Sequence, residues 1–257
     1  MAPWISILPW FLQNDGRSQK VLNKHIKNHK PILVFDLHGV IFSFSIWAGI
    51  KDFWQLSFKQ KLLVLRAAGT PGLAWDALKL LFTGGVVEQA VLNIKIKYPK
   101  LTGVIPFALK VINNQIPKPE MVKLLQDLKS QNYTLLIFSN IGEQSIEILK
   151  HKYPEIFSLF SGELVASASD NYISKPQPAA FKKFLAKLTF VVPARHSIYA
   201  TAGSSPMGVS NHNNFLLIDD RDKNLQAAQA CGMQVLKFKS SVQLALALSK
   251  FKRVINL

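Results

Sequence analysis

Three things are scarce in this sequence, namely cysteine, acidic residues and long hydrophobic runs, and each scarcity excludes a class of protein. Cys231 is the only cysteine among 257 residues, so the chain is not a scaffold built on internal disulfides. There are 15 acidic residues against 31 basic ones, which gives a net charge of +16. This positive charge favours anionic partners, such as phosphate esters, nucleic acid or an anionic membrane surface, and says nothing about the fold.

No part of the sequence predicts a membrane-spanning helix, which needs about 20 predominantly apolar residues. The uncharged stretch Leu37–Ile50 is too short, and the uncharged residues 197–218 are rich in Ser, Asn and Gly. The apolar N-terminus, MAPWISILPW, lacks the positive segment of a signal peptide and contains two prolines. We therefore expect a cytoplasmic protein with an N-terminal extension over residues 1–30. We favour an arm folded back on the domain; the alternative is a weak surface anchor or partner-docking segment.

The residues that are present form the composition of a folded globular chain. Hydrophobic residues make up 49% and charged residues 18%, which excludes an intrinsically disordered chain. Thirteen glycines and thirteen prolines are ordinary usage and exclude a collagen-like fibre. At roughly 100–200 residues per domain, this length predicts one large domain or a domain with an insert.

Strands and helices alternate in two separate parts of the sequence. The first predicted strand is the apolar run Ile32–Phe35, and Gly39 permits a tight turn shortly after it. Further strands are predicted at Tyr133–Phe138, Leu164–Ala166, Phe215–Ile218 and Gln234–Phe238. Helices are predicted at 120–131, 143–152, 178–188, 222–231 and 240–250. This alternation predicts a parallel sheet covered by helices on both faces.

The segment between these two parts contains helical patterns only. Helical periodicity covers residues 51–68, 71–82 and 86–99, and no alternating strand pattern is visible from 43 to 116. We therefore predict an α/β core made of residues 31–42 and 117–257, with residues 43–116 inserted as a helical cap. The polar stretch Thr201–Asn214 is predicted to be a long loop.

Polar side chains follow several of the predicted strands directly. Their positions are Asp36 and His38 after the first strand, Ser139 and Asn140 after YTLLIF, Asp219 and Asp220 after FLLI, and Lys175 before a helix. Each alone has a bland explanation, because a strand-end Asp is often a helix cap and a lone Ser or Asn a turn residue. In a doubly wound sheet, however, ligands bind at the carboxyl ends of the strands. The set therefore predicts a shared site at that edge.

Four motifs in order, VFDLHGV, LLIFSN, ISKPQP and LLIDDRDKN, give the sequence a resemblance to the haloacid dehalogenase superfamily, in which phosphatases predominate. The resemblance extends over nearly the whole chain from residue 31. It implies a Rossmann-like, doubly wound parallel sheet with an α-helical cap of the C1 type between the first two motifs. Fold alone does not determine function, so the reaction is argued from the residues of the site.

The resemblance implies a Mg²⁺-dependent phosphatase acting on a small phosphorylated substrate. Asp36 would be the nucleophile and would form an aspartyl-phosphate, since covalent catalysis divides one difficult step into two easier ones. Asp36, Asp220 and the backbone carbonyl of His38 would bind Mg²⁺, with Asp219 close to the ion. Mg²⁺ is a hard cation that prefers such oxygen ligands.

The resemblance also assigns the residues that would hold the phosphoryl group. Ser139 would donate a hydrogen bond to it, together with Asn140 and main-chain donors at the start of the next helix. Lys175 would neutralise developing charge and keep Asp36 ionised beside the other carboxylates. Asn224 would orient its neighbours within the fourth motif.

Position 38 departs from the family pattern, because phosphatases of this family usually carry a second aspartate there as general acid and base. An imidazole with an ordinary pKa near 6.5 suits both tasks, so His38 could replace that aspartate. Alternatively, the protein is slow or inactive and keeps a pocket for a phosphorylated ligand or partner. A dehalogenase-type reaction is the third possibility, against which the pair Asp219 and Asp220 argues.

Aromatic and basic residues outside the motifs have two interpretations each. Trp47, Phe53, Trp54 and Phe58 could line a substrate pocket, but their helical spacing favours packing inside the cap. The basic, amphipathic residues 237–253 could lie on an anionic membrane, although a closing helix packed on the sheet is the interpretation we favour. The net charge leaves an anionic membrane surface or another polyanion open as a partner.

Overall fold

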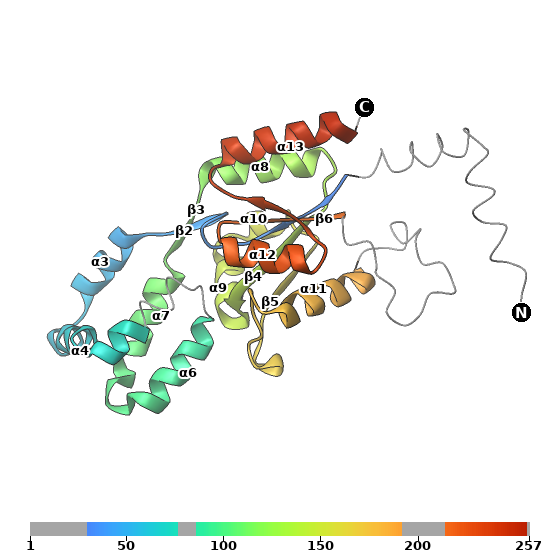
Figure 1. Ribbon diagram of the computed structural model, residues 1–257. Helices are drawn as coiled ribbons and strands as arrows, with labels where there is room; N and C mark the ends of the chain where they lie inside the picture. Colours follow the sequence, from blue (N-terminus) through green and yellow to red (C-terminus); the bar gives the residue numbers. More distant parts are fainter. Residues whose placement is uncertain (1–29, 77–85, 192–213, 256–257) are drawn as a thin grey trace, which may run out of the picture.

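The computed structural model describes residues 30–76, 86–191 and 214–255 (Figure 1). The N-terminal extension before residue 30 and nearly all of the long loop predicted at 201–214 lie outside these residues. None of the helices in the described ranges is both long and apolar enough to cross a bilayer.

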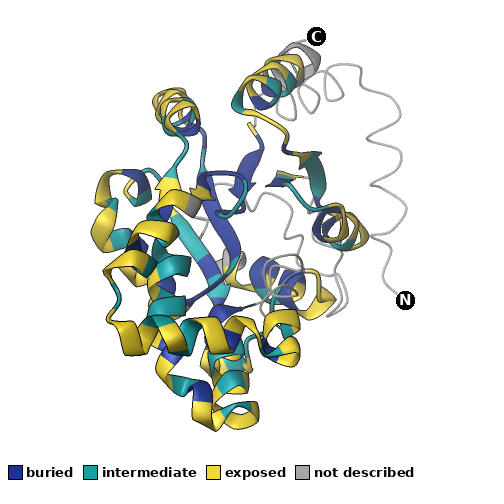
Figure 2. Ribbon diagram, turned by 90° about the vertical axis from the view of Figure 1, so that its left-hand side faces the viewer, coloured by how far each residue is buried: buried dark blue, intermediate teal, exposed yellow. Residues whose placement is uncertain are grey.

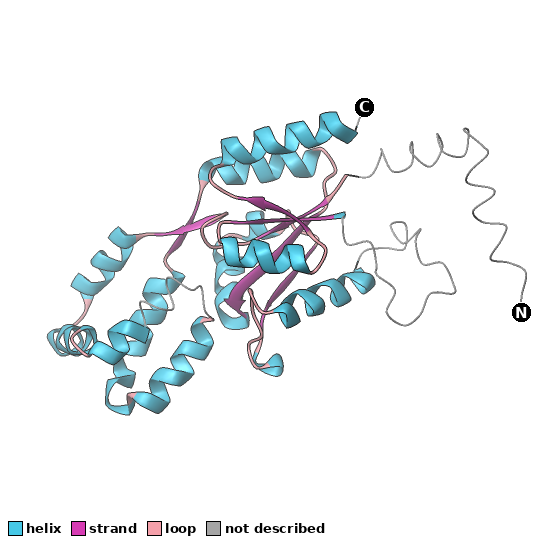
Figure 3. Ribbon diagram, in the orientation of Figure 1, coloured by secondary structure: helices cyan, strands magenta, loops and turns pink. Residues whose placement is uncertain are grey.

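A five-stranded sheet forms the centre of the molecule (Figure 3). Its strands are β1 (Ile32–Phe35), β4 (Leu135–Gly142), β5 (Gly162–Ala166), β6 (Phe215–Asp219) and β7 (Gln234–Lys237). Their spatial order is β5-β4-β1-β6-β7, and every neighbouring pair is parallel. The order reverses between β1 and β6, the place where a doubly wound sheet opens a crevice for ligands. The predicted Rossmann-like α/β fold is thus confirmed.

Helices cover both faces of this sheet, because side chains alternate along each strand. Leu33 and Phe35 of β1 belong to one buried cluster, and Ile32 and Val34 to the other. The first cluster packs against α8 (Pro119–Ser130), α9 (Glu143–Lys152) and α13 (Ser241–Ile255), with the short α10 (Pro154–Phe157) beside them. The second packs against α11 (Pro178–Val191) and α12 (Asp222–Ala230). The prediction that the C-terminal helix packs on the core is therefore confirmed by its buried Leu244 and Leu248.

A helical segment is inserted between two short strands that pair with each other. β2 (Phe42–Phe44) and β3 (Gln115–Pro117) are antiparallel, with Phe44 opposite Gln115. Between them lie α3 (Ile46–Gln55), α4 (Phe58–Ala68), helical residues 71–76, α6 (Val87–Lys97), a 3₁₀ helix (Pro99–Val104) and α7 (Ile105–Asn113). The hydroxyls of Ser45 and Ser57 cap the first two helices, and Ser57 forms a capping box with Gln60.

Two details of the sequence-based prediction are wrong in this region. The strands β2 and β3 were not expected, because three residues are too few for an alternating pattern to be visible. Trp47, Trp54 and Phe58 do not pack inside the cap but are 81%, 68% and 81% exposed. Of the four aromatic residues at its start, Phe53 alone packs inward, against Phe107 at 6.2 Å between ring centroids.

Candidate active site

The carboxylate of Asp36 follows β1 at the carboxyl end of the sheet and is almost completely buried. Its Oδ1 accepts a hydrogen bond from the backbone N–H of Leu37 at 2.8 Å and lies 3.3 Å from the Nζ of Lys175. Among the described residues no hydrogen-bond partner is found for its Oδ2. One oxygen of this carboxylate is therefore fixed and the other is available to an incoming group.

A tight turn after Asp36 brings the first and fourth motifs together. The backbone N–H groups of Ile41 and Phe42 both donate to the carbonyl of Leu37, which closes the turn. Gly39 adopts φ = 77°, and a Cβ at this position would lie 2.2 Å from Oδ2 of Asp220. Only glycine satisfies both conditions, so residue 39 sets how closely Asp220 approaches the turn.

Asp219 and Asp220 end β6 side by side but have different surroundings. Asp219 is fully buried and fully hydrogen-bonded, by Lys175 Nζ at 2.7 Å, the N–H of Arg221 at 2.9 Å and Nδ2 of Asn224 at 3.0 Å. Asp220 is partly exposed, and its Oδ1 is a buried atom to which no described residue donates a hydrogen bond; Nε of Arg221 lies 4.0 Å away. Burial, Asp36 and Asp219 raise the pKa of Asp220 above its ordinary value.

Lys175 lies at the centre of the site with its side chain completely buried. Its ammonium lies between Asp36 and Asp219, at 3.3 and 2.7 Å from their oxygens, and 5.2 Å from the centre of the Phe138 ring. Burial alone would lower the pKa of Lys175, but Asp36 and Asp219 outweigh burial and the pKa is raised. Lys175 is therefore a permanent cation at neutral pH.

Asn140 holds the backbone of Lys175 in place. Its Oδ1 accepts from the N–H of Lys175 at 2.8 Å, and its Nδ2 donates to the carbonyl of the same residue at 2.7 Å. The second and third motifs are thus joined by a pair of hydrogen bonds. The predicted phosphate-binding role of Asn140 stays a prediction, and its side chain is already used to orient the lysine.

The three carboxylates form a donor set that fits a divalent cation. One oxygen from each of Asp36, Asp219 and Asp220 lies within 4.8 Å of the others. One lysine does not neutralise three negative charges, and burial together with Asp36 and Asp219 raises the pKa of Asp220. Hard oxygen ligands of this kind suit Mg²⁺.

Ser139 lies on β4, the strand beside β1, two residues beyond Ile137, which pairs with Phe35. Its hydroxyl is a buried polar atom without a hydrogen-bond partner in the described part of the chain. Such an atom costs free energy unless a ligand pairs with it. It is therefore a candidate donor to an anion bound at the sheet edge.

The N-terminus of α9, which was expected to help hold the anion, receives a carboxylate from the inserted helices instead. Oε1 of Glu88, in the first turn of α6, accepts hydrogen bonds from the N–H and the hydroxyl of Ser145 at 3.1 and 2.8 Å. Glu88 also lies against Gly142, where a Cβ would be 1.9 Å from its Oε2. A single Glu in a helical segment gives no pattern in the sequence, so this contact was not predicted.

His38, two residues after Asp36, is partly buried, and its ring centroid lies 5.1 Å from that of Phe44. Burial, Arg221 and Lys175 together lower the pKa of His38 to about 4. The imidazole is then neutral at pH 7. In that state it can accept a proton from water.

Lys118, like Glu88, is a residue of this region that the sequence did not single out. Its Nζ donates to the carbonyl of Gly39 and lies 5.0 Å from the centre of the Phe238 ring. Burial lowers the pKa of Lys118, although Asp220 and Glu120 act in the opposite direction. Lys118 thus supports the turn that carries His38.

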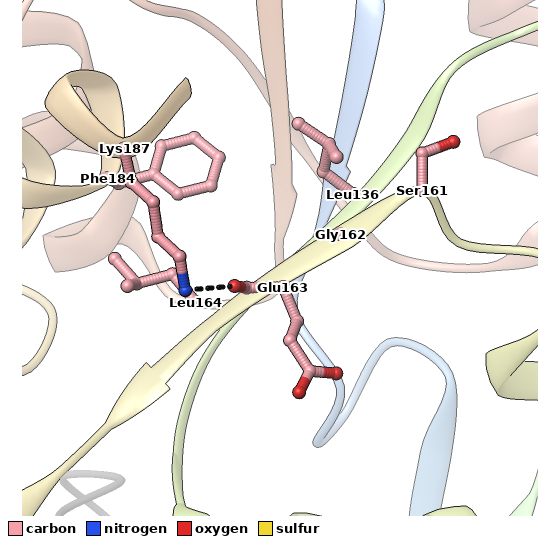
Figure 4. Close-up of a pocket in the computed structure, with 7 residues that line it drawn as sticks. All are labelled: Leu136, Ser161, Gly162, Glu163, Leu164, Phe184 and Lys187. Carbon is pink, nitrogen blue, oxygen red and sulfur yellow. Dashed lines mark hydrogen bonds between the residues drawn. The ribbon is translucent and has the colours of Figure 1, made fainter. Parts of the chain in front are cut away.

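A separate cavity of about 260 Å³ lies along β5 (Figure 4). Its lining residues are Leu136, Ser161, Gly162, Glu163, Leu164, Phe184 and Lys187. The Nζ of Lys187 donates to the carbonyl of Glu163 at 3.2 Å across it (Figure 4). None of these residues belongs to the carboxylate cluster, so the cavity is not part of the site.

Comparisons with known proteins agree with this geometry. Residues 31–232 match a family model described as haloacid dehalogenase-like hydrolase. The sequence matches no curated protein.

Solved structures of a HAD family enzyme from Bacteroides thetaiotaomicron resemble this fold. One is 16% identical, covers 82% of this chain and 95% of its own, and has a TM-score of 0.51. Its magnesium complex is 15% identical, with 82% and 94% covered and a TM-score of 0.53. A complex with magnesium and inorganic phosphate is 17% identical, with the same coverage and a TM-score of 0.50. At such identities the likeness shows the fold alone.

Proposed function

This chain belongs to the haloacid dehalogenase-like hydrolase family, and on that premise we propose that it is a Mg²⁺-dependent phosphatase that hydrolyses a small phosphate ester. The observation that carries the proposal is the group of three carboxylates around one buried lysine at the edge of the sheet. The Bacteroides enzyme of the same fold was crystallised with magnesium and inorganic phosphate, which is the ligand pair that this site would take.

In the first step, Oδ2 of Asp36 attacks the phosphorus of the ester. The phosphorus–oxygen bond to the alcohol breaks, its electron pair stays on the departing oxygen, and an aspartyl-phosphate forms. Lys175 and the hydroxyl of Ser139 stabilise the charge on the phosphoryl oxygens. Asp36, Asp220 and the carbonyl of residue 38 would hold Mg²⁺, with Asp219 near it; when bound, the ion supplies charge neutralisation for the phosphoryl group.

In the second step, water attacks the aspartyl-phosphate and His38 accepts its proton. Phosphate is released and the carboxylate of Asp36 is regenerated. With its pKa lowered to about 4, His38 is a weaker base than an ordinary histidine, but its ring is neutral and able to take up a proton at pH 7. General acid–base catalysis is typically worth about 10²–10⁴-fold in rate. Whether His38 also protonates the leaving alcohol is a prediction that leaving-group dependence tests.

We also propose that residues 43–116 act as a cap over this site and contribute to the choice of substrate. Pairing of β2 with β3 places both ends of the segment at one point of the core, and Glu88 connects its middle to α9 beside Ser139. Substrate identity would then depend on the side chains of this segment.

The test is phosphate release by the purified full-length protein across a panel of phosphorylated metabolites, with Mg²⁺ and with EDTA. Asp36→Asn and Asp220→Asn should each reduce turnover by at least about a thousandfold, because reacting groups act as a unit. Asp222→Asn is the matched control, since Asp222 lies two residues after Asp220 and is exposed in an ion pair with Lys237. Wild-type turnover by Asp36→Asn would refute the assignment of the nucleophile.

A second candidate function rests on the histidine at position 38. Without the usual aspartate, the same pocket could bind a phosphorylated ligand or partner and turn it over weakly or not at all. His38→Asp distinguishes the two: if the wild type is inert and this variant hydrolyses phosphate esters, the binding function holds. If the wild type is active, His38→Ala should slow alkyl phosphates more than aryl phosphates, whose leaving groups need little protonation.

A further inference from the structure

The helices α3 and α4 expose apolar side chains at helical spacing. On α3 the exposed residues are Trp47, Ile50 and Trp54, and on α4 they are Phe58, Leu62 and Leu65. The two helices lie at the left-hand end of the molecule in Figure 1, away from the five-stranded sheet. Figure 2 looks at the molecule from that end and shows the nearest helices largely exposed.

Each of the two helices also has an inner face, which packs against other helices of the cap. The inner face of α3 packs on α7, where Phe53 contacts Phe107. The inner face of α4, with Leu63 and Ala67, forms a small buried cluster with Leu101. Among the described residues, the exposed apolar side chains of α3 and α4 thus belong to no buried cluster, and large exposed apolar patches mark interaction sites.

The same two helices are basic. They carry Lys51, Lys59, Lys61 and Arg66, none of which forms a salt bridge with any residue in the described ranges. Asp52 is their single acidic residue; it is buried on the inner side and paired with Lys110 at 2.7 Å. The outer surface thus combines apolar side chains with uncompensated positive charge.

The exposed apolar residues of α3 and those of α4 come together where α3 ends and α4 begins. There the ammonium of Lys61 lies 5.2 Å from the centre of the Trp54 ring. Helices that lie in the interface of a bilayer have this composition, with tryptophan, phenylalanine and leucine next to lysine. Lysine places its apolar stem along such a surface and its charge among the headgroups.

We propose that this outer surface of α3 and α4 docks on an anionic lipid bilayer. A protein partner explains the composition less well, because protein–protein interfaces are depleted in lysine. Docking uses no residue of the carboxylate site and does not depend on the proposed phosphatase activity. The excess of positive charge on the whole chain acts in the same direction by attracting it to the anionic surface.

The experiment is co-sedimentation of the full-length protein with phosphatidylcholine vesicles that contain phosphatidylglycerol, and with phosphatidylcholine vesicles alone. We expect binding to the anionic vesicles and little to the neutral ones. The double variant Trp54→Ser, Phe58→Ser should lower the partition coefficient at least about tenfold. The double variant Lys59→Gln, Arg66→Gln should lower it by roughly ten- to thirty-fold, and salt should weaken binding by the wild type.

Matched controls come from the core. Val242→Ser with Leu246→Ser removes an exposed apolar pair from α13, and Lys123→Gln with Lys182→Gln removes two exposed charges. Both should bind as the wild type does. If the aromatic variant fails to fold, as circular dichroism would show, the charge variant decides.

Three results would overturn the proposal. The first is no binding to anionic vesicles, or equal binding to neutral ones. The second is an equal loss of binding in the core controls, which would indicate a general charge effect. The third is a dimer, seen by light scattering, that the Trp54 and Phe58 substitutions dissociate, since a second copy would then cover this surface.

Discussion

At the edge of the five-stranded sheet this chain buries charge, whereas on the outside of α3 and α4 it exposes aromatic rings. The side chains of Lys175 and Asp219 have no exposed surface at all, while Trp47 and Phe58 are 81% exposed. Folding alone favours the opposite arrangement in both places. At the sheet edge the compensation for the buried Lys175 is internal, because Asp36 and Asp219 flank its ammonium. The exposed rings of α3 and α4 have no such compensation among the described residues, and the proposed bilayer would supply it.

The largest loss of stability is expected when the buried ammonium of Lys175 is removed from between its two carboxylates. Lys175→Met would leave Asp36 and Asp219 buried without their cation, and removing one partner of a buried pair costs about 3–5 kcal/mol. Urea unfolding of the metal-free protein measures this loss. Adding Asp219→Asn should recover part of it; a loss below about 1 kcal/mol in the single variant would show that the pair is not coupled.

The same substitution in the two regions should give different results. Leu33→Ala in β1 removes a completely buried side chain and should lower the free energy of unfolding by about 2–5 kcal/mol. Leu62→Ala on α4, where the side chain is 59% exposed, should change it by less than about 0.5 kcal/mol. Equal losses would mean that the outer surface of α4 is packed, and would remove the contrast between core and cap.

Lowering the pH should destabilise the folded protein through the buried ring of His38. The unfolded chain protonates this imidazole below about pH 6.5, but the folded chain only below about pH 4, so stability falls as the pH falls between these values. At pH 5 in EDTA, the wild type should have lost about 2 kcal/mol more than His38→Gln, relative to pH 7.5. Urea unfolding at both pH values checks this, and parallel curves for the two proteins would contradict it.

The smallest effect concerns the contact between the two regions. Glu88→Gln removes a negative charge from the N-terminus of α9 and should lower the free energy of unfolding by about 0.3–1 kcal/mol. Glu147→Gln, in an exposed pair with Lys150 on the same helix, is the control. A larger loss in the control would show that Glu88 does not stabilise α9.

The sheet and the residues at its edge could be predicted because their signals are local. The apolar runs before Asp36, Ser139 and Asp219 define buried strands, and parallel strands bring their carboxyl ends to one edge. The strand before Ser139 runs on to Gly142, beyond its predicted end at Phe138, because polar residues at a sheet edge interrupt the apolar pattern before the pairing ends. Asp36, Lys175, Asp219 and Asp220 lie together as the order of motifs predicted.

The features that could not be predicted are mainly contacts between residues that lie far apart in the sequence. The contact of Glu88 with Ser145 spans 57 positions and that of Lys118 with Gly39 spans 79, and neither has a periodic signal. The direction of the pKa shift of His38 depends on how deeply the ring is buried and on how near Arg221 and Lys175 lie, which only the arrangement in space decides. Helical spacing of aromatic residues indicates one face of a helix but not whether that face is covered, and this is why Trp54 was misplaced.

The pairing of β2 with β3 has a consequence for how this protein could have been assembled. Phe44 faces Gln115 in an antiparallel ladder, so the helical segment is, in topological terms, the loop of a hairpin that has grown to contain a small helical unit. A two-residue turn such as Asn-Gly could join the same two positions without changing the register of the strands. A different segment placed between the same two strands would keep both junctions, so the hairpin is a natural point at which to graft another cap onto the same carboxylates.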